Sequence, residues 1–368
     1  MKFKYVIVGA GLSGATVAER IASQLNEQVL VIEKRKHIAG NCYDFHDDNG
    51  ILVHKYGPHV FHTEIEEVWE YLSDFTPWHR YQLRVLSYVA GKLVPIPINL
   101  DTVNELFETN LTVDELPEFF ARIREPISEI KTSADVVLSQ VGRYLYEKMY
   151  KNYTKKQWGV TPDELDPLVI SRIPIHMSRD DRYFGDPYQG LPKWGYTRMV
   201  ERMLSHPKIK LLLGVDYKEV TSWIDYENLI YTGPIDYYFN YKYGKLPYIS
   251  LDMKFETYDQ EYYQPVAVVN YPNDYDFTRI TEFKNMTGQK STRTTILKEF
   301  PHRATAEDKP YYPVFDEQTS ALAEKYRKEA EKESNTLFVG RLAEYRYYNM
   351  DVAVSRALEI FREKIKAG

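Results

Sequence analysis

The chain has 368 residues, of which 43% are hydrophobic and 27% charged, as is ordinary for a globular protein of two or three domains. Its net charge of −6 and its lack of a dense Lys/Arg block exclude a nucleic-acid partner held by bulk charge, and its single cysteine, Cys42, excludes a disulfide framework or a cysteine-rich metal site, so we predict no metal. No apolar stretch approaches the roughly 18 residues that span a bilayer, and the first strand begins too early for a signal peptide, so we expect a cytoplasmic protein without a membrane partner.

The N-terminal residues predict a βαβ unit. Residues 3–8 form an apolar run suited to a buried parallel strand, apolar residues then recur at helical spacing, and residues 29–33 form the next strand. Farther along, we expect a helix over 64–75, strands over 81–98 and mostly helix over 101–155. The segment 160–195 contains five prolines, which predict mostly loop.

The second half of the chain returns to the first sheet and adds another. A helix over 196–205 precedes strands over 210–215 and 228–233, and alternating stretches over 245–300 predict an antiparallel sheet. A helix over 318–332, a strand over 336–340 and a helix over 350–364 follow. The predicted fold is α/β, with a discontinuous Rossmann-like dinucleotide domain (1–80, 196–240 and 317–368), a helical insert domain (99–178) and an antiparallel β-sheet domain (81–98, 179–195 and 241–316).

A glycine motif carries the cofactor prediction. Gly9, Gly11 and Gly14 form G-x-G-x-x-G between the first strand and the first helix, where a pyrophosphate can approach the backbone at the helix N-terminus. Glu33 ends the second strand, where an acid can hold ribose hydroxyls. The alternative is a tight turn in a βαβ unit that binds nothing. Strand, helix, strand and acid in this order favour dinucleotide binding.

The residues after Glu33 favour FAD over a nicotinamide cofactor. Flavoproteins with this fold often follow the acid with an arginine and a glycine pair, and Arg35 and Gly40 fit, although Ala39 replaces one glycine. The C-terminal stretch TLFVGRLAEYRYYNMDVAVSRAL has the strand–loop–helix form that closes such a cofactor site. Its helix N-terminus would favour the anion of a reduced flavin.

Cationic and aromatic residues outside this unit stand in short motifs. These are YTKKQWG (153–159), RIP (172–174), YFGDPYQG (183–190), FTRI (277–280), PYYPV (310–314) and GRLAEYRYYN (340–349). A strand arginine is usually solvated or ion-paired, and loop tyrosines and tryptophans more often pack than bind. No single motif therefore identifies a substrate.

Together, these motifs closely resemble the bacterial UDP-galactopyranose mutases. The resemblance runs almost from end to end, in the same order, through VIVGAGLSG, HKYGPHVFHT, YTKKQWG, YFGDPYQG and GRLAEYRYYNMD. It implies a homodimer that holds reduced FAD and a nucleotide-diphosphate hexose. It also implies that UDP-galactopyranose and UDP-galactofuranose are interconverted without net redox change: N5 of the flavin attacks the anomeric carbon and expels UDP, and the sugar ring recloses through its 4-hydroxyl.

The resemblance also implies roles for residues at the substrate end. Arg172 and Arg279 match two arginines that clamp the diphosphate, and they are the predicted catalytic side chains. Tyr153 matches a residue that stacks near uracil, and Trp158 an aromatic residue next to the sugar. The other predicted substrate residues match tyrosines that bond the phosphates and two positions near the substrate: Tyr183, Tyr312, Tyr347, Asn270 and Asn349.

The predicted cofactor residues combine the glycine motif, the residues after the second strand and the C-terminal motif. His59 matches a residue whose backbone lies by flavin N5, and its alternative role is that of a packed, hydrogen-bonded histidine. The full set is Gly9, Gly11, Ser13, Gly14, Glu33, Lys34, Arg35, Gly40, Asn41, His59, Arg341 and Met350.

Two departures from the family pattern leave the hexose open. Many members carry aspartate where Asn349 stands, and some carry asparagine near Leu83. Relatives act on UDP-N-acetylgalactose or dTDP-fucose, so the same chemistry on those sugars is one alternative. Two more distant alternatives are a flavin oxidoreductase of the amine-oxidase type and a nucleotide-sugar binding protein without activity.

Overall fold

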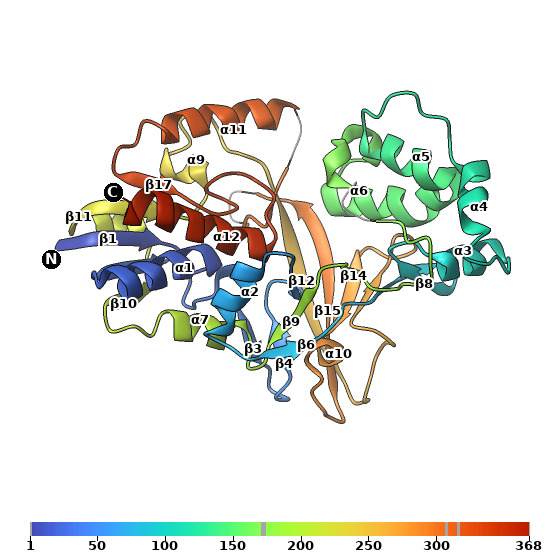
Figure 1. Ribbon diagram of the computed structural model, residues 1–368, viewed down its shortest axis with the longest axis horizontal. Coiled ribbons are helices and arrows are strands. Elements are labelled where there is room, and N and C mark those ends of the chain that lie inside the picture. Colours follow the sequence, from blue (N-terminus) through green and yellow to red (C-terminus); the bar gives the residue numbers. More distant parts are fainter. Residues whose placement is uncertain (1, 171–173, 306–307, 315–316, 368) are drawn as a thin grey trace. The chain divides into compact units, whose positions relative to one another are not determined.

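The computed structural model describes residues 2–170, 174–305, 308–314 and 317–367 (Figure 1). The chain forms two compact units, and each is assembled from segments that are far apart in the sequence. The first unit contains Met1–Tyr81, Asp186–Leu246 and Glu317–Gly368, and the second contains Gln82–Gly185 and Pro247–Asp316. The division into three domains stays a prediction.

A five-stranded parallel sheet forms the centre of the first unit and confirms the predicted Rossmann-like fold. Its strands take the order β10-β2-β1-β11-β17. All five residues of β2 are buried, and all but Glu33 are apolar, as expected for a strand covered on both faces. The edge strand β10 is largely exposed. The bounds are β1 (Lys2–Val8), β2 (Val29–Glu33), β10 (Ile209–Leu213), β11 (Asp225–Tyr231) and β17 (Thr336–Phe338).

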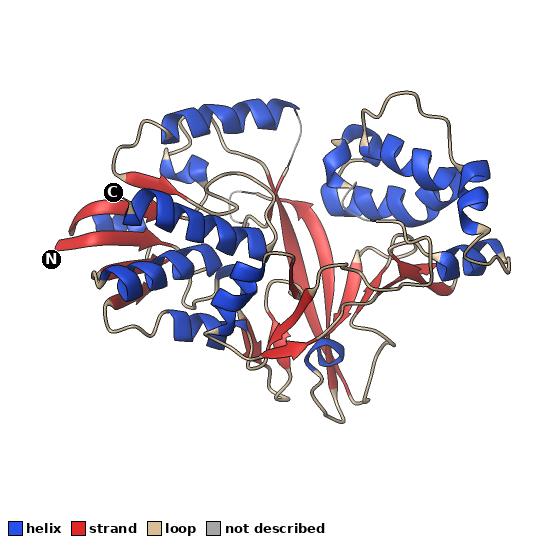
Figure 2. Ribbon diagram, viewed as in Figure 1, coloured by secondary structure: helices blue, strands red, loops and turns tan. Residues whose placement is uncertain are grey.

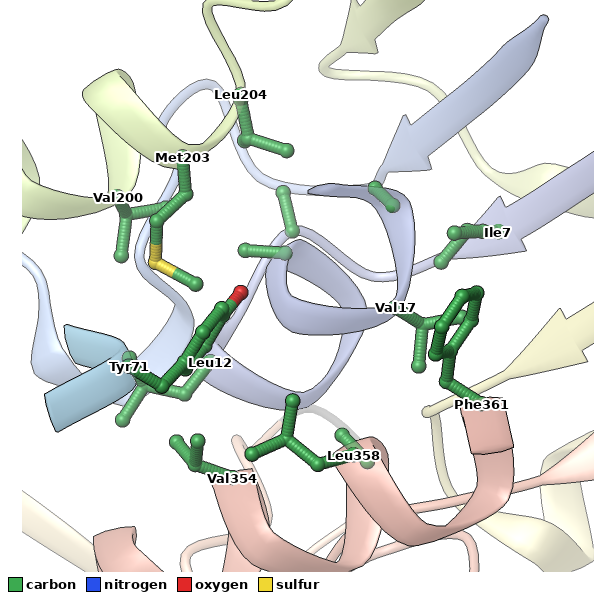
Figure 3. Packing of buried hydrophobic residues seen from close by; sticks show 14 of the residues in the cluster. Ile7, Leu12, Val17, Tyr71, Val200, Met203, Leu204, Val354, Leu358 and Phe361 are labelled. Atoms are coloured by element: carbon green, nitrogen blue, oxygen red, sulfur yellow. The ribbon is translucent and has the colours of Figure 1, made fainter. Parts of the chain in front are cut away.

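Helices from both ends of the chain pack together in the first unit. Figure 3 shows side chains of β1, α2, α7, α12 and η6 around α1, with Val17 near Phe361 and Leu12 near Tyr71. The C-terminal helix therefore shares one apolar core with the first βαβ unit. The helical segments of this unit are α1 (Leu12–Arg20), η1 (Ile21–Leu25), η2 (Gly40–Cys42), α2 (Glu66–Ser73), α7 (Tyr196–Met203), α8 (Tyr217–Thr221), α9 (Ile235–Tyr238), α11 (Glu317–Ala330), α12 (Met350–Ile360) and η6 (Phe361–Lys366).

Two small antiparallel sheets complete the first unit, and one of them corrects a prediction. β9 (Tyr188–Pro192) lies within residues 160–195, which the sequence predicts to be mostly loop, and within residues 179–195, which it predicts to belong to the antiparallel β-sheet domain. It instead pairs with β5 (Phe61–Thr63) and β6 (Trp78–Arg80). Its one proline, Pro192, is the last residue of the strand, and Pro187 precedes the strand, so neither interrupts its middle. The other small sheet joins β3 (Asp44–His46) and β4 (Leu52–His54).

A seven-stranded sheet in the order β16-β12-β15-β14-β13-β7-β8 forms the second unit's core. The strands predicted over 245–300 pair antiparallel as expected, but β7, which the prediction placed in the same antiparallel domain, runs parallel to β13. These two strands come from separate segments, so no hairpin dictates their relative direction. The bounds are β7 (Val85–Val89), β8 (Lys92–Ile96), β12 (Tyr248–Tyr258), β13 (Val268–Asn270), β14 (Arg279–Glu282), β15 (Thr294–Arg303) and β16 (Tyr312–Pro313).

The second unit also contains a group of helices that follows β8 in the chain, drawn in blue in Figure 2. Thr132 and Asp135 form a capping box that starts α5, since each side chain satisfies a backbone N–H of the other's residue. Among the described residues, no helix is long and apolar enough to cross a membrane. The helical segments are α3 (Leu100–Phe107), α4 (Leu116–Ile123), α5 (Ser133–Leu145), η3 (Tyr146–Lys151), α6 (Asn152–Trp158), η4 (Pro162–Glu164), η5 (Pro167–Val169) and α10 (Phe283–Thr287).

Candidate functional site

The glycine loop between β1 and α1 is packed too tightly for side chains. A Cβ atom added to Gly14 would lie 2.0 Å from the carbonyl oxygen of Gly9, and one added to Gly40 would lie 2.9 Å from Cα of Gly11. Gly9 itself has φ +105°, which side chains rarely adopt. The loop therefore brings bare backbone to the N-terminus of α1, the arrangement that fits a pyrophosphate.

Glu33 braces this loop from the end of β2. Its Oε2 accepts a 2.9 Å hydrogen bond from the Ala10 N–H, and its Oε1 accepts a 2.8 Å bond from the Arg35 N–H. An ionised carboxylate offers about four lone-pair sites, so two backbone bonds leave acceptor capacity for ribose hydroxyls. Glu33 thus holds the loop in place, and it also lies where the ribose of a dinucleotide would bind.

Arg35 presents a buried donor without a partner. Its Nη2 donates to Oδ1 of Asn41 at 2.9 Å, and its guanidinium lies 4.6 Å from the ring centroid of Tyr56. Its Nη1 is buried and has no hydrogen-bond partner within the described chain. A buried unsatisfied donor is costly, and an acceptor on a bound cofactor would satisfy it. The neighbouring Lys34, in contrast, is exposed and forms an ion pair with Asp216 at 3.1 Å.

The C-terminal motif closes onto the glycine loop. The Ser13 hydroxyl of α1 donates to the carbonyl of Ala353 in α12 at 3.3 Å. A Cβ atom on Gly340 would lie 2.9 Å from Oγ of Ser13. Met350, the first residue of α12, places its sulfur 3.5 Å from that of Cys42. The predicted cofactor residues from the two ends of the chain, which also include the partly buried Arg341, are therefore brought together within the first unit.

The backbone of His59 is held from two sides. Its N–H donates a 3.0 Å hydrogen bond to Nδ1 of His54, and its carbonyl accepts a 3.2 Å bond from the Tyr196 hydroxyl. Burial lowers the pKa of His54 to about 3, so the imidazole stays neutral and Nδ1 can accept. Sequence reasoning missed His54 because the HKYGPHVFHT motif drew attention to His59 alone.

In the second unit, a polar row crosses four strands of the large sheet. Ser87 on β7, Asn270 on β13, Arg279 on β14 and Glu299 on β15 are successive partners in the strand register. Partners in register present their side chains on the same face of a sheet. Asn270 and Arg279, predicted from different motifs, are therefore neighbours.

Glu299 holds the arginine of this row. Nε of Arg279 donates to Oε1 of Glu299 at 2.7 Å, and the Glu299 side chain is fully buried. Burial by itself disfavours the guanidinium charge, but the carboxylate raises the pKa of Arg279 well above its ordinary value. Oε2 of Glu299 is buried without a hydrogen-bond partner in the part of the chain that the structure describes. Sequence reasoning missed Glu299, and an acidic residue inside the apolar strand TTILKEF was the available signal.

Predicted tyrosines lie near Arg279. Tyr153 and Tyr312 are close enough to interact electrostatically with its guanidinium, and Tyr183 is close to Tyr153. Burial raises the pKa of the Tyr153 phenol. The ring of Tyr312 lies 6.4 Å from that of Trp158, centroid to centroid. The structure thus brings together the aromatic residues of YTKKQWG, YFGDPYQG and PYYPV beside one fixed guanidinium.

This arrangement can bind an anion. A guanidinium offers charge-assisted hydrogen bonds to phosphate oxygens, and tyrosine hydroxyls and flat aromatic faces supply further polar and stacking contacts. Arg172, the second predicted arginine, lies outside the described residues. Tyr347 and Asn349 belong to the first unit, where both are exposed and Asn349 immediately precedes α12.

Leu83 lies beside this group. Its carbonyl accepts a 2.8 Å hydrogen bond from the N–H of Tyr183, and its side chain is buried. The departure from the family pattern at this position therefore places an apolar side chain next to a predicted substrate residue.

The chain matches two families of known proteins. Residues 148–347 match the family described as UDP-galactopyranose mutase, and residues 7–75 match the NAD(P)-binding Rossmann-like domain. The chain is 40% identical to the probable UDP-galactopyranose mutase of Klebsiella pneumoniae, over 96% of this chain and 92% of that protein. It is 37% identical to the dTDP-fucopyranose mutase of Escherichia coli, over 99% and 98%. The crystal structure of reduced UDP-galactopyranose mutase has the same fold, with a TM-score of 0.78 at 18% identity over 100% of this chain and 95% of that chain.

Proposed function

Because this chain belongs to the UDP-galactopyranose mutase family, we propose that it is an isomerase that interconverts UDP-galactopyranose and UDP-galactofuranose with reduced FAD. The observation that carries the proposal is the fixed Arg279, beside Tyr153 and in register with Asn270, on a chain whose other unit has a dinucleotide-binding loop. An oxidase of the amine-oxidase type would need an apolar substrate tunnel instead of an arginine surrounded by tyrosines.

The cofactor fits the first unit. The glycines at positions 9, 11 and 14, the carboxylate of Glu33 and the unpaired Nη1 of Arg35 suit the pyrophosphate and ribose of FAD. The helix N-terminus at Met350 suits the negative charge of a reduced flavin. When bound, reduced FAD supplies the nucleophile for the anomeric carbon and the reaction leaves it reduced.

The protein's own residues act on the leaving group and the nucleotide. Arg279, held by Glu299, stabilises the negative charge that grows on the diphosphate as UDP departs. Arg172 is the proposed second clamp of that diphosphate. The tyrosines donate hydroxyl hydrogens to phosphate oxygens, Tyr153 stacks near uracil, and Trp158 contacts the sugar. Because Glu299 keeps Arg279 in place before substrate arrives, little reorganisation is needed during the reaction.

Product analysis with reduced enzyme tests this function. The purified protein, loaded with FAD, is incubated with UDP-galactopyranose with and without dithionite, and products are separated by chromatography. We expect the furanose only after reduction, with no stoichiometric consumption of NAD(P)H or oxygen. A colourless protein that takes up no FAD, or equal rates before and after reduction, would contradict the proposal. Product formation tied one-to-one to oxygen or NAD(P)H would favour an oxidoreductase.

A specific observation favours a second substrate. The dTDP-fucopyranose mutase of Escherichia coli is as similar to this chain as the galactose relatives are. Fucose lacks the 6-hydroxyl of galactose, and the buried Leu83, whose carbonyl accepts the N–H of Tyr183, is apolar where some relatives carry asparagine nearby. Parallel assays with dTDP-fucopyranose and UDP-N-acetylgalactosamine rank the sugars by kcat/KM. The homodimer is proposed on the family resemblance alone, and the cytoplasmic location stays the expectation drawn from the sequence.

A further inference from the structure

Lys156 of the YTKKQWG motif takes no part in the proposed chemistry, but its ammonium group binds three backbone carbonyls. Its Nζ lies 2.6 Å from the carbonyl oxygen of Tyr271, 2.7 Å from that of Tyr275 and 3.2 Å from that of Phe277. An ammonium group has three hydrogens to donate, so the three carbonyls use all of them. Lys155, its neighbour, is exposed.

These three carbonyls belong to the loop that joins two strands of the predicted substrate site. β13 ends at Asn270, and β14 begins at Arg279. The loop closes on itself where the N–H of Tyr271 donates to the carbonyl of Thr278 at 2.8 Å. Its shape therefore sets how Asn270 and Arg279 enter the sheet from either side.

The same helical segment holds the loop at a second point. Nδ2 of Asn152 donates to Oδ1 of Asn273 at 2.8 Å, and Nδ2 of Asn273 donates to the carbonyl of Lys148 at 2.9 Å. Asn152 and Lys156 lie one turn apart on α6, on either side of Tyr153 in the chain. The helix that carries Tyr153 and Trp158 is thereby joined to the loop next to Arg279.

We propose that Lys156 is a positioning residue for the nucleotide-diphosphate site, fixing Tyr153 and Trp158 on α6 relative to Asn270 and Arg279 on the sheet. This inference rests on the proposed function. Without the ammonium, three loop carbonyls that face the helix lose their donor, and the loop must rearrange to satisfy them. Such a rearrangement moves the two sides of the site apart without removing any group that touches the substrate.

The test compares Lys156→Met, Lys156→Arg and the matched control Lys155→Met, each loaded with FAD. Isothermal titration with UDP gives the Kd, and steady-state assays of the reduced enzyme give KM and kcat. We expect Lys156→Met to raise the Kd and KM about tenfold or more, because charge-assisted hydrogen bonds are lost. The reduction potential of the flavin and the Lys155→Met constants stay as in the wild type. Lys156→Arg, which keeps several donors, recovers part of the affinity.

An unchanged UDP Kd in Lys156→Met would overturn the inference, whether or not the melting temperature falls, because a purely structural lysine would affect stability alone. If Lys156→Met does not fold, Asn273→Ala decides. It removes the second attachment of the same loop, so a severalfold rise in the UDP Kd supports the inference and an unchanged Kd contradicts it. A wild-type protein that converts no nucleotide sugar would instead contradict the proposed function, so the two failures are distinguishable.

Discussion

Arg279 and Glu299 form an ion pair in adjacent strands, with Nε of the arginine 2.7 Å from Oε1 of the glutamate. Glu299 has no exposed surface, whereas Arg279 retains 23% of its side-chain exposure. The glutamate thus fixes the direction of the arginine, while part of the arginine side chain stays exposed.

We expect Arg279→Ala to lower kcat by about 10²- to 10³-fold, because a preorganised donor to the developing charge is lost. The yellow colour of the bound flavin should remain. Stopped assays with reduced enzyme measure the effect. Arg293→Ala removes an exposed arginine that pairs with Asp259, and it serves as the matched control with wild-type turnover. Normal turnover in Arg279→Ala would refute the anion clamp.

Glu299→Ala tests the other member of the pair. Removing one partner leaves a partly buried charge unpaired, which costs about 3 kcal/mol of the free energy of unfolding. The double variant Arg279→Ala/Glu299→Ala should be less destabilised than the sum of the two single variants, because neither charge is then left alone. Urea unfolding of all three gives the coupling. Additive values would show that the pair does not act as a unit.

Gly14→Ala should abolish or strongly weaken FAD binding. Alanine in place of glycine favours a helix by about 1 kcal/mol, but the new Cβ would lie 2.0 Å from the backbone oxygen of Gly9, and such overpacking costs about 1–3 kcal/mol. The flavin content of the purified protein measures the outcome. Gly185→Ala, where an added Cβ meets nothing within 4 Å, is the control and should keep its full flavin content.

Replacement of Tyr153 separates its ring from its hydroxyl. We expect Tyr153→Ala to raise the substrate KM about tenfold, since stacking on a base contributes roughly 1–3 kcal/mol. Tyr153→Phe keeps the ring and should stay within about twofold of the wild-type KM, by the same reasoning. Steady-state kinetics with reduced enzyme distinguish the two. An unchanged KM in the alanine variant would remove the stacking role.

His54 should make the fold sensitive to acid. Its pKa is lowered by burial from 6.5 to about 3 in the folded protein, so between these values the unfolded chain binds a proton that the folded chain does not. The contribution of His54 to stability is therefore complete above pH 6.5 and falls by about 1.4 kcal/mol for each pH unit below it, until about pH 3.

His54→Asn gives the comparison, because asparagine can still accept the N–H of His59 but does not titrate. Urea unfolding of both proteins between pH 7 and pH 5 should show a shallower loss of stability in the variant. Parallel curves for the two proteins would mean that His54 is not the titrating group.

The sequence by itself determined the features that depend on short stretches of chain. The apolar runs of β1 and β2, the glycine loop between them and the helix that follows were predictable because strand burial, tight turns and helix periodicity are written in neighbouring residues. The family followed from motifs in a fixed order. The site residues stay predictions that the variants above test.

Only the tertiary structure decided what meets across the sheets. Nothing local indicates that Asn270, Arg279 and Glu299 share one row, that β7 runs parallel to β13, or that β9 pairs with β5 and β6. Strand register and direction depend on which faces are buried against distant segments, and these contacts form only in the folded chain. The three carbonyls around Lys156 are also brought together by the folded loop. The spacing of the YTKKQWG motif therefore could not indicate the contacts of Lys156.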